Sequence, residues 1–120
     1  MFAETAPLSA PMHLPGADQP VWRDPDSGYL RRQLFLRPDH PVELVAVEMP
    51  AGGRVAMPAS SYAHIRQVVW VREGELTLTE GGQTHRLGPG DALGFGSPSD
   101  AVFANETAAS CSYVVALARS

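Results

Sequence analysis

Residues 67–91, QVVWVREGELTLTEGGQTHRLGPGD, constrain the fold of this chain more than any other stretch. Two short apolar runs flank Gly74, and the pair Gly81-Gly82 and a Gly-Pro-Gly-Asp corner follow them. Val, Trp and Thr in short alternating runs favour a pleated strand over a helix. Paired glycines supply the positive φ angles that tight hairpin turns require. We therefore expect consecutive antiparallel strands here.

The rest of the chain shows the same alternation of short apolar runs and turn residues. Candidate strands are residues 31–36, 42–49, 92–95, 101–104 and 112–118, and turn signals lie at residues 24–28 and 51–53. The run at 42–49 is apolar on both faces, so we expect it to be covered on both sides. No amphipathic helix is visible, and about nine or ten short strands predict an all-β barrel or sandwich.

Length and proline positions indicate how the chain is divided. A chain of 120 residues fits one domain with one core. Residues 1–20 contain four prolines and show no clear period, which rules out a regular helix there. We expect residues 1–20 to form an irregular arm or linker, and residues 21–120 to form a single β-barrel domain.

Composition excludes several classes of function. The net charge of −4 argues against direct nucleic-acid binding by this chain. All nine basic residues are Arg, so chemistry that needs a lysine amine is excluded. Cys111 is the only cysteine, which excludes an intrachain disulfide, and we expect it to be a small buried hydrophobe rather than a redox sensor. No signal peptide or membrane span is visible, so we expect a cytoplasmic protein.

The pattern from about residue 50 to 118 resembles the cupin (RmlC-like) superfamily. The resemblance rests on Pro50 with the glycines at 52 and 53, V-W-V-R-E-G-E-L at 69–76, the glycine hairpin, L-x-x-G-D at 87–91, and Asn105 after a phenylalanine. It implies a cupin-type double-stranded β-helix, that is, a jelly-roll barrel.

The opening of the domain narrows the resemblance. V-W-R-D-P at 21–25, Gly-Tyr at 28–29 and Arg-Arg at 31–32 are similar to the C-terminal cupin sensor domain of XRE-type helix-turn-helix transcriptional regulators. Such regulators are implied to be dimers whose cupin domain responds to a small molecule. The helix-turn-helix part is absent from this chain, so any contact with DNA is an analogy.

Cupin enzymes commonly carry a first metal motif of the form H-x-H-x(3,4)-E-x6-G, and Gly74 fixes its register here. Gln67 stands where the motif has its glutamate. The two histidine positions are Ser61 and Ala63 with the shorter spacing, and Ser60 and Tyr62 with the longer one. A hydroxyl, a methyl and a neutral amide do not replace the imidazole and carboxylate ligands of a transition metal.

The second metal motif also lacks its ligand. Its histidine belongs four residues before Asn105, where Ala101 stands. We therefore expect no metal, no cofactor and no catalytic residue. The alternative is a metal-dependent cupin enzyme of the oxygenase or isomerase type, with an atypical site built from His64 and Asp100 or Tyr62. Asp91 follows a glycine in a tight turn, where its carboxylate is expected to accept local backbone hydrogens.

Strand alternation predicts which side chains face the barrel interior. If Gln67 points inward, so do Ser61, Ala63 and Val69, and His64 points outward unless a β-bulge reverses the order. Gln67 is then either a satisfied core amide or the group that orients a polar ligand. The expected ligand-binding residues of the interior are Ser61, Ala63, Gln67, Val69, Ala101 and Phe103.

Val68 and Trp70 are expected on the outward face of the same strand. An apolar pair on a barrel exterior requires cover from a second subunit, the N-terminal arm or a second sheet. We favour a homodimer interface at Val68 and Trp70. The sequence thus predicts a non-enzymatic cupin domain that binds a small-molecule effector, and a scaffold with a filled barrel is a further alternative.

Overall fold

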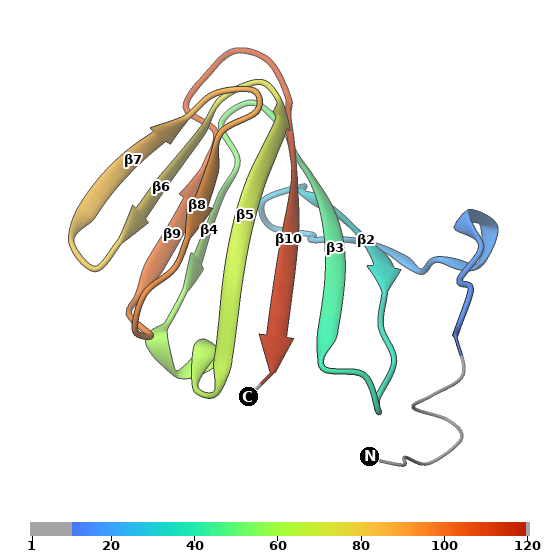
Figure 1. Cartoon of the computed structure of the whole chain (residues 1–120). Helices are drawn as coiled ribbons and strands as arrows, with labels where there is room; N and C mark the ends of the chain where they lie inside the picture. The colour runs from blue at the N-terminus through green and yellow to red at the C-terminus, as the bar shows by residue number, and fades with distance from the viewer. Residues whose placement is uncertain (1–10, 120) are drawn as a thin grey trace.

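The computed structural model describes residues 11–119, and strands dominate this part of the chain (Figure 1). The ten strands are β1 (Val21–Arg23), β2 (Leu30–Phe35), β3 (Val42–Met49), β4 (Arg54–Met57), β5 (Ile65–Glu73), β6 (Leu76–Glu80), β7 (Gln83–Leu87), β8 (Ala92–Gly94), β9 (Ala101–Ala104) and β10 (Cys111–Arg119). Two short 3-10 helices complete the list, η1 (Gly16–Asp18) and η2 (Ala59–Tyr62). The all-β expectation is confirmed.

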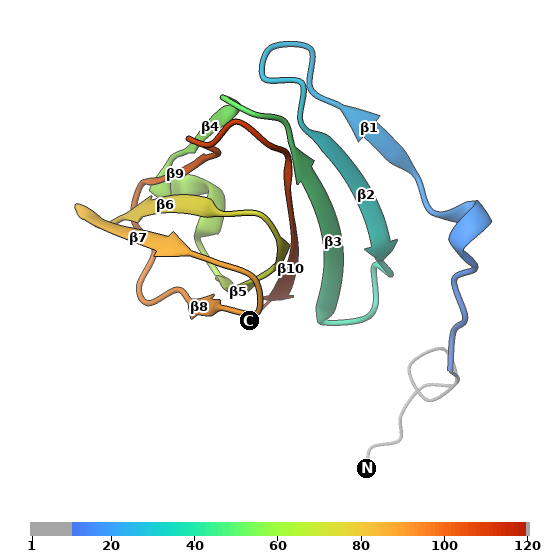
Figure 2. The same cartoon turned by 90° about the horizontal axis from the view of Figure 1, so that it is seen from above.

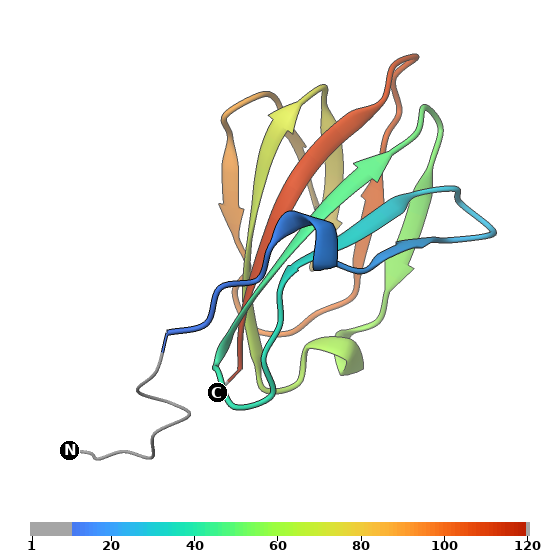
Figure 3. The same ribbon diagram turned by 90° about the vertical axis from the view of Figure 1, so that its right-hand side faces the viewer.

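The strands form two antiparallel sheets that face each other. The larger sheet has the order β1-β2-β3-β10-β5-β8, and the smaller sheet has the order β4-β9-β6-β7. Seen from above, β1 and β2 extend away from the smaller sheet (Figure 2). Figures 1 and 2 place η1 beyond this outer edge, and Figure 3, viewed from that side, shows it in front of the sheet. Residues 1–10 lie outside the described part, so the structure describes the expected arm at 1–20 only from residue 11 onward.

The core lies between the two sheets and draws on inward-facing residues of both. Val45 and Met49 of β3, Val69 and Val71 of β5, and Tyr113 of β10 are all buried. Opposite them lie Leu76, Leu78, Leu87, Ala101 and Phe103 of the smaller sheet. Strand alternation explains this pattern, since every second residue of a strand points to the same face.

Gly74 turns the chain from β5 to β6 at a position where no side chain fits. Its φ is +78°, and a Cβ there would lie 2.7 Å from both the Ser110 carbonyl oxygen and the Cys111 Cβ. The hairpin therefore packs directly against the start of β10. This glycine fixes where β5 ends, and with it the register of the interior residues of β5.

Asn105 joins two loops at the same end of the sandwich as Gly74. Its buried Nδ2 donates to the Met49 and Ala109 carbonyl oxygens at 3.0 and 2.7 Å, while its Oδ1 accepts from the backbone and side chain of Thr107. Its backbone pairs with the turn at Gly52 and Gly53. Asn105, which is part of the sequence resemblance, therefore has a structural role and holds these two loops together.

Two expectations about strands are wrong. β3 was expected to be covered on both faces, but Leu44 and Ala46 are half-buried and Val42 is exposed, because no element within residues 11–119 packs over the outer face of the larger sheet there. The alternation that was expected to begin at Ser61 begins only at Ile65. The preceding residues form η2, and His64 has φ +69°, so strand parity does not apply to Ser61 or Ala63.

Candidate functional site: a cavity between the sheets

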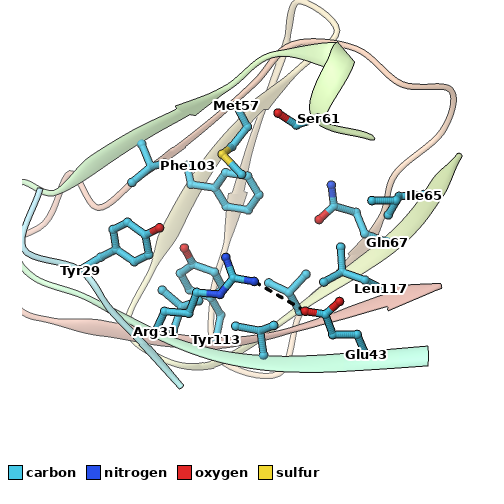
Figure 4. Close-up of a pocket in the computed structure, with 14 residues that line it drawn as sticks. Tyr29, Arg31, Glu43, Met57, Ser61, Ile65, Gln67, Phe103, Tyr113 and Leu117 are labelled. Atoms are coloured by element: carbon cyan, nitrogen blue, oxygen red, sulfur yellow. Dashed lines mark ion pairs between the residues drawn. The ribbon is translucent and has the colours of Figure 1, made fainter. Parts of the chain in front are cut away.

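A cavity of about 240 Å³ opens between the two sheets (Figure 4). Its walls come from β2, β3, β10 and β5 on one side and from β4, η2 and β9 on the other. It is lined by Tyr29, Arg31, Glu43, Val45, Val47, Val55, Met57, Ser61, Ile65, Gln67, Phe103, Tyr113, Val115 and Leu117. Mostly apolar walls with a few convergent polar groups are typical of small-molecule sites.

Two aromatic side chains form one wall of this cavity. The rings of Phe103 and Tyr113 stack with their centroids 6.0 Å apart, and the rings of Phe95 and Phe103 stack with their centroids 6.2 Å apart. Phe103 comes from β9 and Tyr113 from β10, so the stack crosses from one sheet to the other. This cross-sheet contact gives the cavity a wall of apolar surface.

Gln67 is the buried polar side chain of β5 that faces this space. Its backbone is held between β10, where it pairs with Leu117, and the chain after β8, where its carbonyl oxygen accepts from the Phe95 N–H. The side chain is only 5% exposed and points into the cavity in Figure 4. Its Nε2 has no hydrogen-bond partner among the residues that the structure describes. The form of the core-amide reading in which a backbone group satisfies Nε2 is therefore excluded for this part of the chain.

A charged pair lines the cavity wall formed by β2 and β3. Arg31 Nη2 lies 3.7 Å from Glu43 Oε2, and Figure 4 shows the guanidinium directed into the cavity. Glu43 also accepts from Gln33 Nε2 at 2.7 Å and from Arg119 Nη1 at 3.4 Å. The carboxylate thus accepts hydrogen bonds from two residues and forms a longer ion pair with Arg31, which keeps its five N–H donors available.

The expected interior residues divide into three groups. Ser61, Gln67 and Phe103 line the cavity together. Val69 and Ala101 are buried in the core but do not line it. Ala63 is exposed, because it follows η2 and precedes the strand. The expectation that these six residues share one surface is therefore met by only half of them.

Arg31, Glu43 and Tyr29 were missed as cavity residues. They lie in or next to β2 and β3, before the pattern at residues 50–118 that gave the expected interior residues, and β2 reaches the site only through its register with β3. A local signal did exist, since the sequence places Tyr29 and Arg31 two residues apart, on the same face of an extended segment. This signal identifies cavity residues only when the pairing of β2 with β3 is known.

The residues at the metal-ligand positions of cupin enzymes do not fit a metal ion. Gln67 directs an N–H donor into the cavity, Ser61 offers a hydroxyl, and Ala101 offers a methyl, whereas such ions prefer imidazole, carboxylate or thiolate. Within residues 11–119, no three His, Cys, Asp or Glu side chains form a group that could hold an ion. His64 is exposed, and the side chain of Tyr62 lies outside the described set.

Two acidic residues and the cysteine have structural surroundings. Asp91 Oδ2 accepts from the Gly88 N–H at 2.8 Å, which confirms the expected local bond. Asp100 Oδ1 accepts from the Ala59 N–H at 2.8 Å and so fixes the start of η2. Cys111 is buried, as expected, and burial raises the pKa of its thiol to about 11.

Val68 and Trp70 lie on the outer face of the larger sheet, with 46% and 45% of their surface exposed. Trp70 of β5 pairs with Val114 of β10, which in turn pairs with Ala46 of β3. In the same way, Val68 pairs with Ala116, which pairs with Leu44. Directly paired residues share a face of the sheet. These six residues form a continuous outer apolar face across β3, β10 and β5.

Neither a family model nor a curated protein matches this sequence. Solved structures do match, and they show that the chain has the cupin fold. The Cupin_2 domain of an XRE-family transcriptional regulator from Enterobacter cloacae aligns with a TM-score of 0.71 at 15% identity, covering 77% of this chain and 97% of that domain. An HTH_3-family transcriptional regulator from Vibrio cholerae aligns with a TM-score of 0.70 at 18% identity, covering 80% of this chain and 54% of the regulator.

The same fold occurs in proteins described as enzymes. A protein from Thermotoga maritima described as a predicted oxalate decarboxylase aligns with a TM-score of 0.76 at 10% identity, covering 91% of this chain and all 100% of that one. At such identities the likeness defines the fold and not the reaction. This chain spans about half the length of the Vibrio regulator. Among residues 11–119, no helix is long and apolar enough to cross a membrane.

Proposed function

We propose that this chain is a non-enzymatic cupin domain that binds a small-molecule effector in the cavity between its sheets. We further propose that it is the cytoplasmic sensor part of a transcriptional regulator. The observation that carries the first proposal is the buried Nε2 of Gln67, which faces the cavity and has no hydrogen-bond partner within residues 11–119.

An unpartnered buried donor is costly, and this cost favours ligand binding. Leaving such a group unsatisfied costs about 1–3 kcal/mol. An acceptor atom on a bound molecule offsets that cost, whereas a barrel that served only as a scaffold gains nothing from the amide. Gln67 stands at the position of the metal-binding glutamate of cupin enzymes, and its amide adds N–H donors where a carboxylate would only accept.

The regulatory part of the proposal is supported by the likeness to regulator cupin domains. A ligand changes the state of a regulator only if it binds two arrangements with different affinity. The cavity is suited to this, because its lining includes strands of the larger sheet, whose outer face is apolar and exposed. A ligand that shifts β3, β5 or β10 also shifts that outer face.

We propose a second copy of this chain as the partner on the outer apolar face, with Val68 and Trp70 at its centre. Exposed apolar faces of this kind are typical of association sites. The face includes β10, the central strand next to β3 and β5, and residues on the inner side of the same three strands line the cavity. Dimer geometry and cavity occupancy are thus coupled through shared strands.

A metabolite screen combined with elemental analysis tests this function. Thermal-shift measurements over a broad panel of small metabolites are expected to give stabilising hits, and calorimetry is expected to give one ligand per chain. Gln67→Met is expected to remove or strongly weaken the hits. Stoichiometric metal in the purified protein that supports turnover would instead favour the enzyme. A panel without any response would leave a scaffold.

A further inference from the structure

We infer that the effector is a small organic acid with an apolar body, whose carboxylate pairs with Arg31 and which also presents an acceptor oxygen to Gln67 Nε2. This inference rests on the proposed function, since it names the class of ligand for that same cavity. It is carried by the charges and donors that line the cavity.

The charge balance at the cavity wall favours an anion. Two guanidinium groups, those of Arg31 and Arg119, contact the single carboxylate of Glu43. The Arg31 contact is the longer of the two, at 3.7 Å against 3.4 Å, and Glu43 has a further donor in Gln33 at 2.7 Å. The lining itself holds one positive and one negative charge, and Arg119, which lies outside the lining, adds a second positive charge beside Glu43. This group of three side chains therefore carries one net positive charge, and Glu43 is occupied. A cationic amine would find no free carboxylate in the cavity to pair with, whereas a carboxylate ligand can form an ion pair with the Arg31 guanidinium.

The donors of the cavity lead to the same ligand class. Arg31 offers N–H donors in a planar fork that matches a carboxylate. Gln67 Nε2 is a second donor, and Figure 4 shows it entering the same cavity from β5 while Arg31 enters from β2. Tyr29 adds a hydroxyl near Arg31 in that view. A ligand that satisfies these groups must be rich in acceptors.

Size and wall chemistry define the rest of the ligand. A volume of about 240 Å³ equals the share of roughly eight water molecules in the liquid. This suits a molecule of about eight to ten non-hydrogen atoms, which is smaller than most drug-sized ligands. The apolar walls include the rings of Phe103 and Tyr113 and the aliphatic side chains of Val45 and Val115. A benzoate-sized aromatic acid or a branched aliphatic acid meets both conditions.

Strand β2 offers a matched control for Arg31. Arg32 is the next residue, and its side chain is exposed rather than part of the cavity lining. Both residues pair with β3, Arg31 with Val47 and Arg32 with Ala46. Arg31→Met and Arg32→Met therefore remove the same charge from the same strand, but only the first removes it from the cavity.

The test is calorimetry with four probes: benzoate, 4-methylpentanoate, the neutral benzamide and the cationic benzylamine. We expect both carboxylates to bind and to be favoured over benzamide and benzylamine. Arg31→Met is expected to weaken benzoate binding by about ten- to a hundredfold, and Arg32→Met by less than about twofold. Raising the ionic strength is expected to weaken benzoate binding to the unaltered protein but not benzamide binding, and this readout needs no variant.

The outcomes separate this inference from the proposed function. If benzamide or benzylamine binds at least as tightly as benzoate, or if Arg31→Met leaves benzoate affinity unchanged, the ligand class is wrong and the sensor proposal stands. If neither carboxylate binds but other metabolites do, the inference is also wrong. If nothing binds to the correctly folded protein, both are wrong.

Discussion

Gln67 links the sequence to the function at the scale of a single residue. Replacing it by Met removes a buried donor that lacks a partner, so we expect the ligand-free protein to gain about 1 kcal/mol in free energy of unfolding while losing effector binding. Denaturant unfolding measures the first change and calorimetry the second. Gln33→Met is the control, because Gln33 Nε2 donates to Glu43 at 2.7 Å, and its removal is expected to destabilise. A loss of stability in Gln67→Met would mean that the amide is satisfied after all.

Cys111 illustrates how burial controls a single titrating group. Because burial raises the pKa of its thiol to about 11, the folded protein keeps this thiol protonated while the unfolded chain loses the proton near the ordinary value of 9.0. The stabilisation linked to this group is therefore complete below pH 9 and is lost as the pH rises towards 11. We expect no reaction with a thiol reagent at pH 8 until denaturant is added. Cys111→Ala is expected to abolish this pH dependence, and rapid native labelling would contradict the account.

The β5–β6 hairpin tests the fold at the scale of an element. Gly74→Ala combines an unfavourable φ of +78° with clashes at 2.7 Å, whereas Gly82→Ala has a similar φ of +83° and open space around it. We expect the Gly82 variant to lose about 1 kcal/mol in free energy of unfolding, and the Gly74 variant to lose clearly more, about 3 kcal/mol. Denaturant unfolding measures both. Equal losses would mean that backbone conformation alone, and not contact with β10, requires Gly74.

The elements also show how far the sequence predicts the site. The alternation of the sequence correctly predicted which side chains of residues 65–71 are buried, because side chains of a strand point to opposite faces in turn. Gln67 and Val69 are buried, and Val68 and Trp70 are exposed. It failed before Ile65, where η2 and the left-handed backbone of His64 break the strand. It also missed Arg31, because the register that brings β2 to the cavity depends on pairing between distant segments.

At the scale of the whole molecule, the outer apolar face predicts assembly. If a second copy covers it, Trp70→Arg places a charge in the interface and is expected to weaken the dimer by at least about 2 kcal/mol. Sedimentation velocity measures the shift from dimer to monomer. Trp22→Arg is the control, because Trp22 is also exposed, at 53%, but lies on β1 and outside this face. Dissociation caused by the Trp22 variant alone would locate the interface at the other end of the sheet.

The most direct measurement of the central claim is the NMR signal of the Gln67 side-chain amide during titration with a hit from the metabolite screen. We predict that the two Nε2 proton resonances, assigned by their loss in Gln67→Met, shift and saturate at one ligand per chain as the donor gains an acceptor. Resonances that stay unchanged while the ligand binds, or that respond instead to a metal ion, would contradict the account.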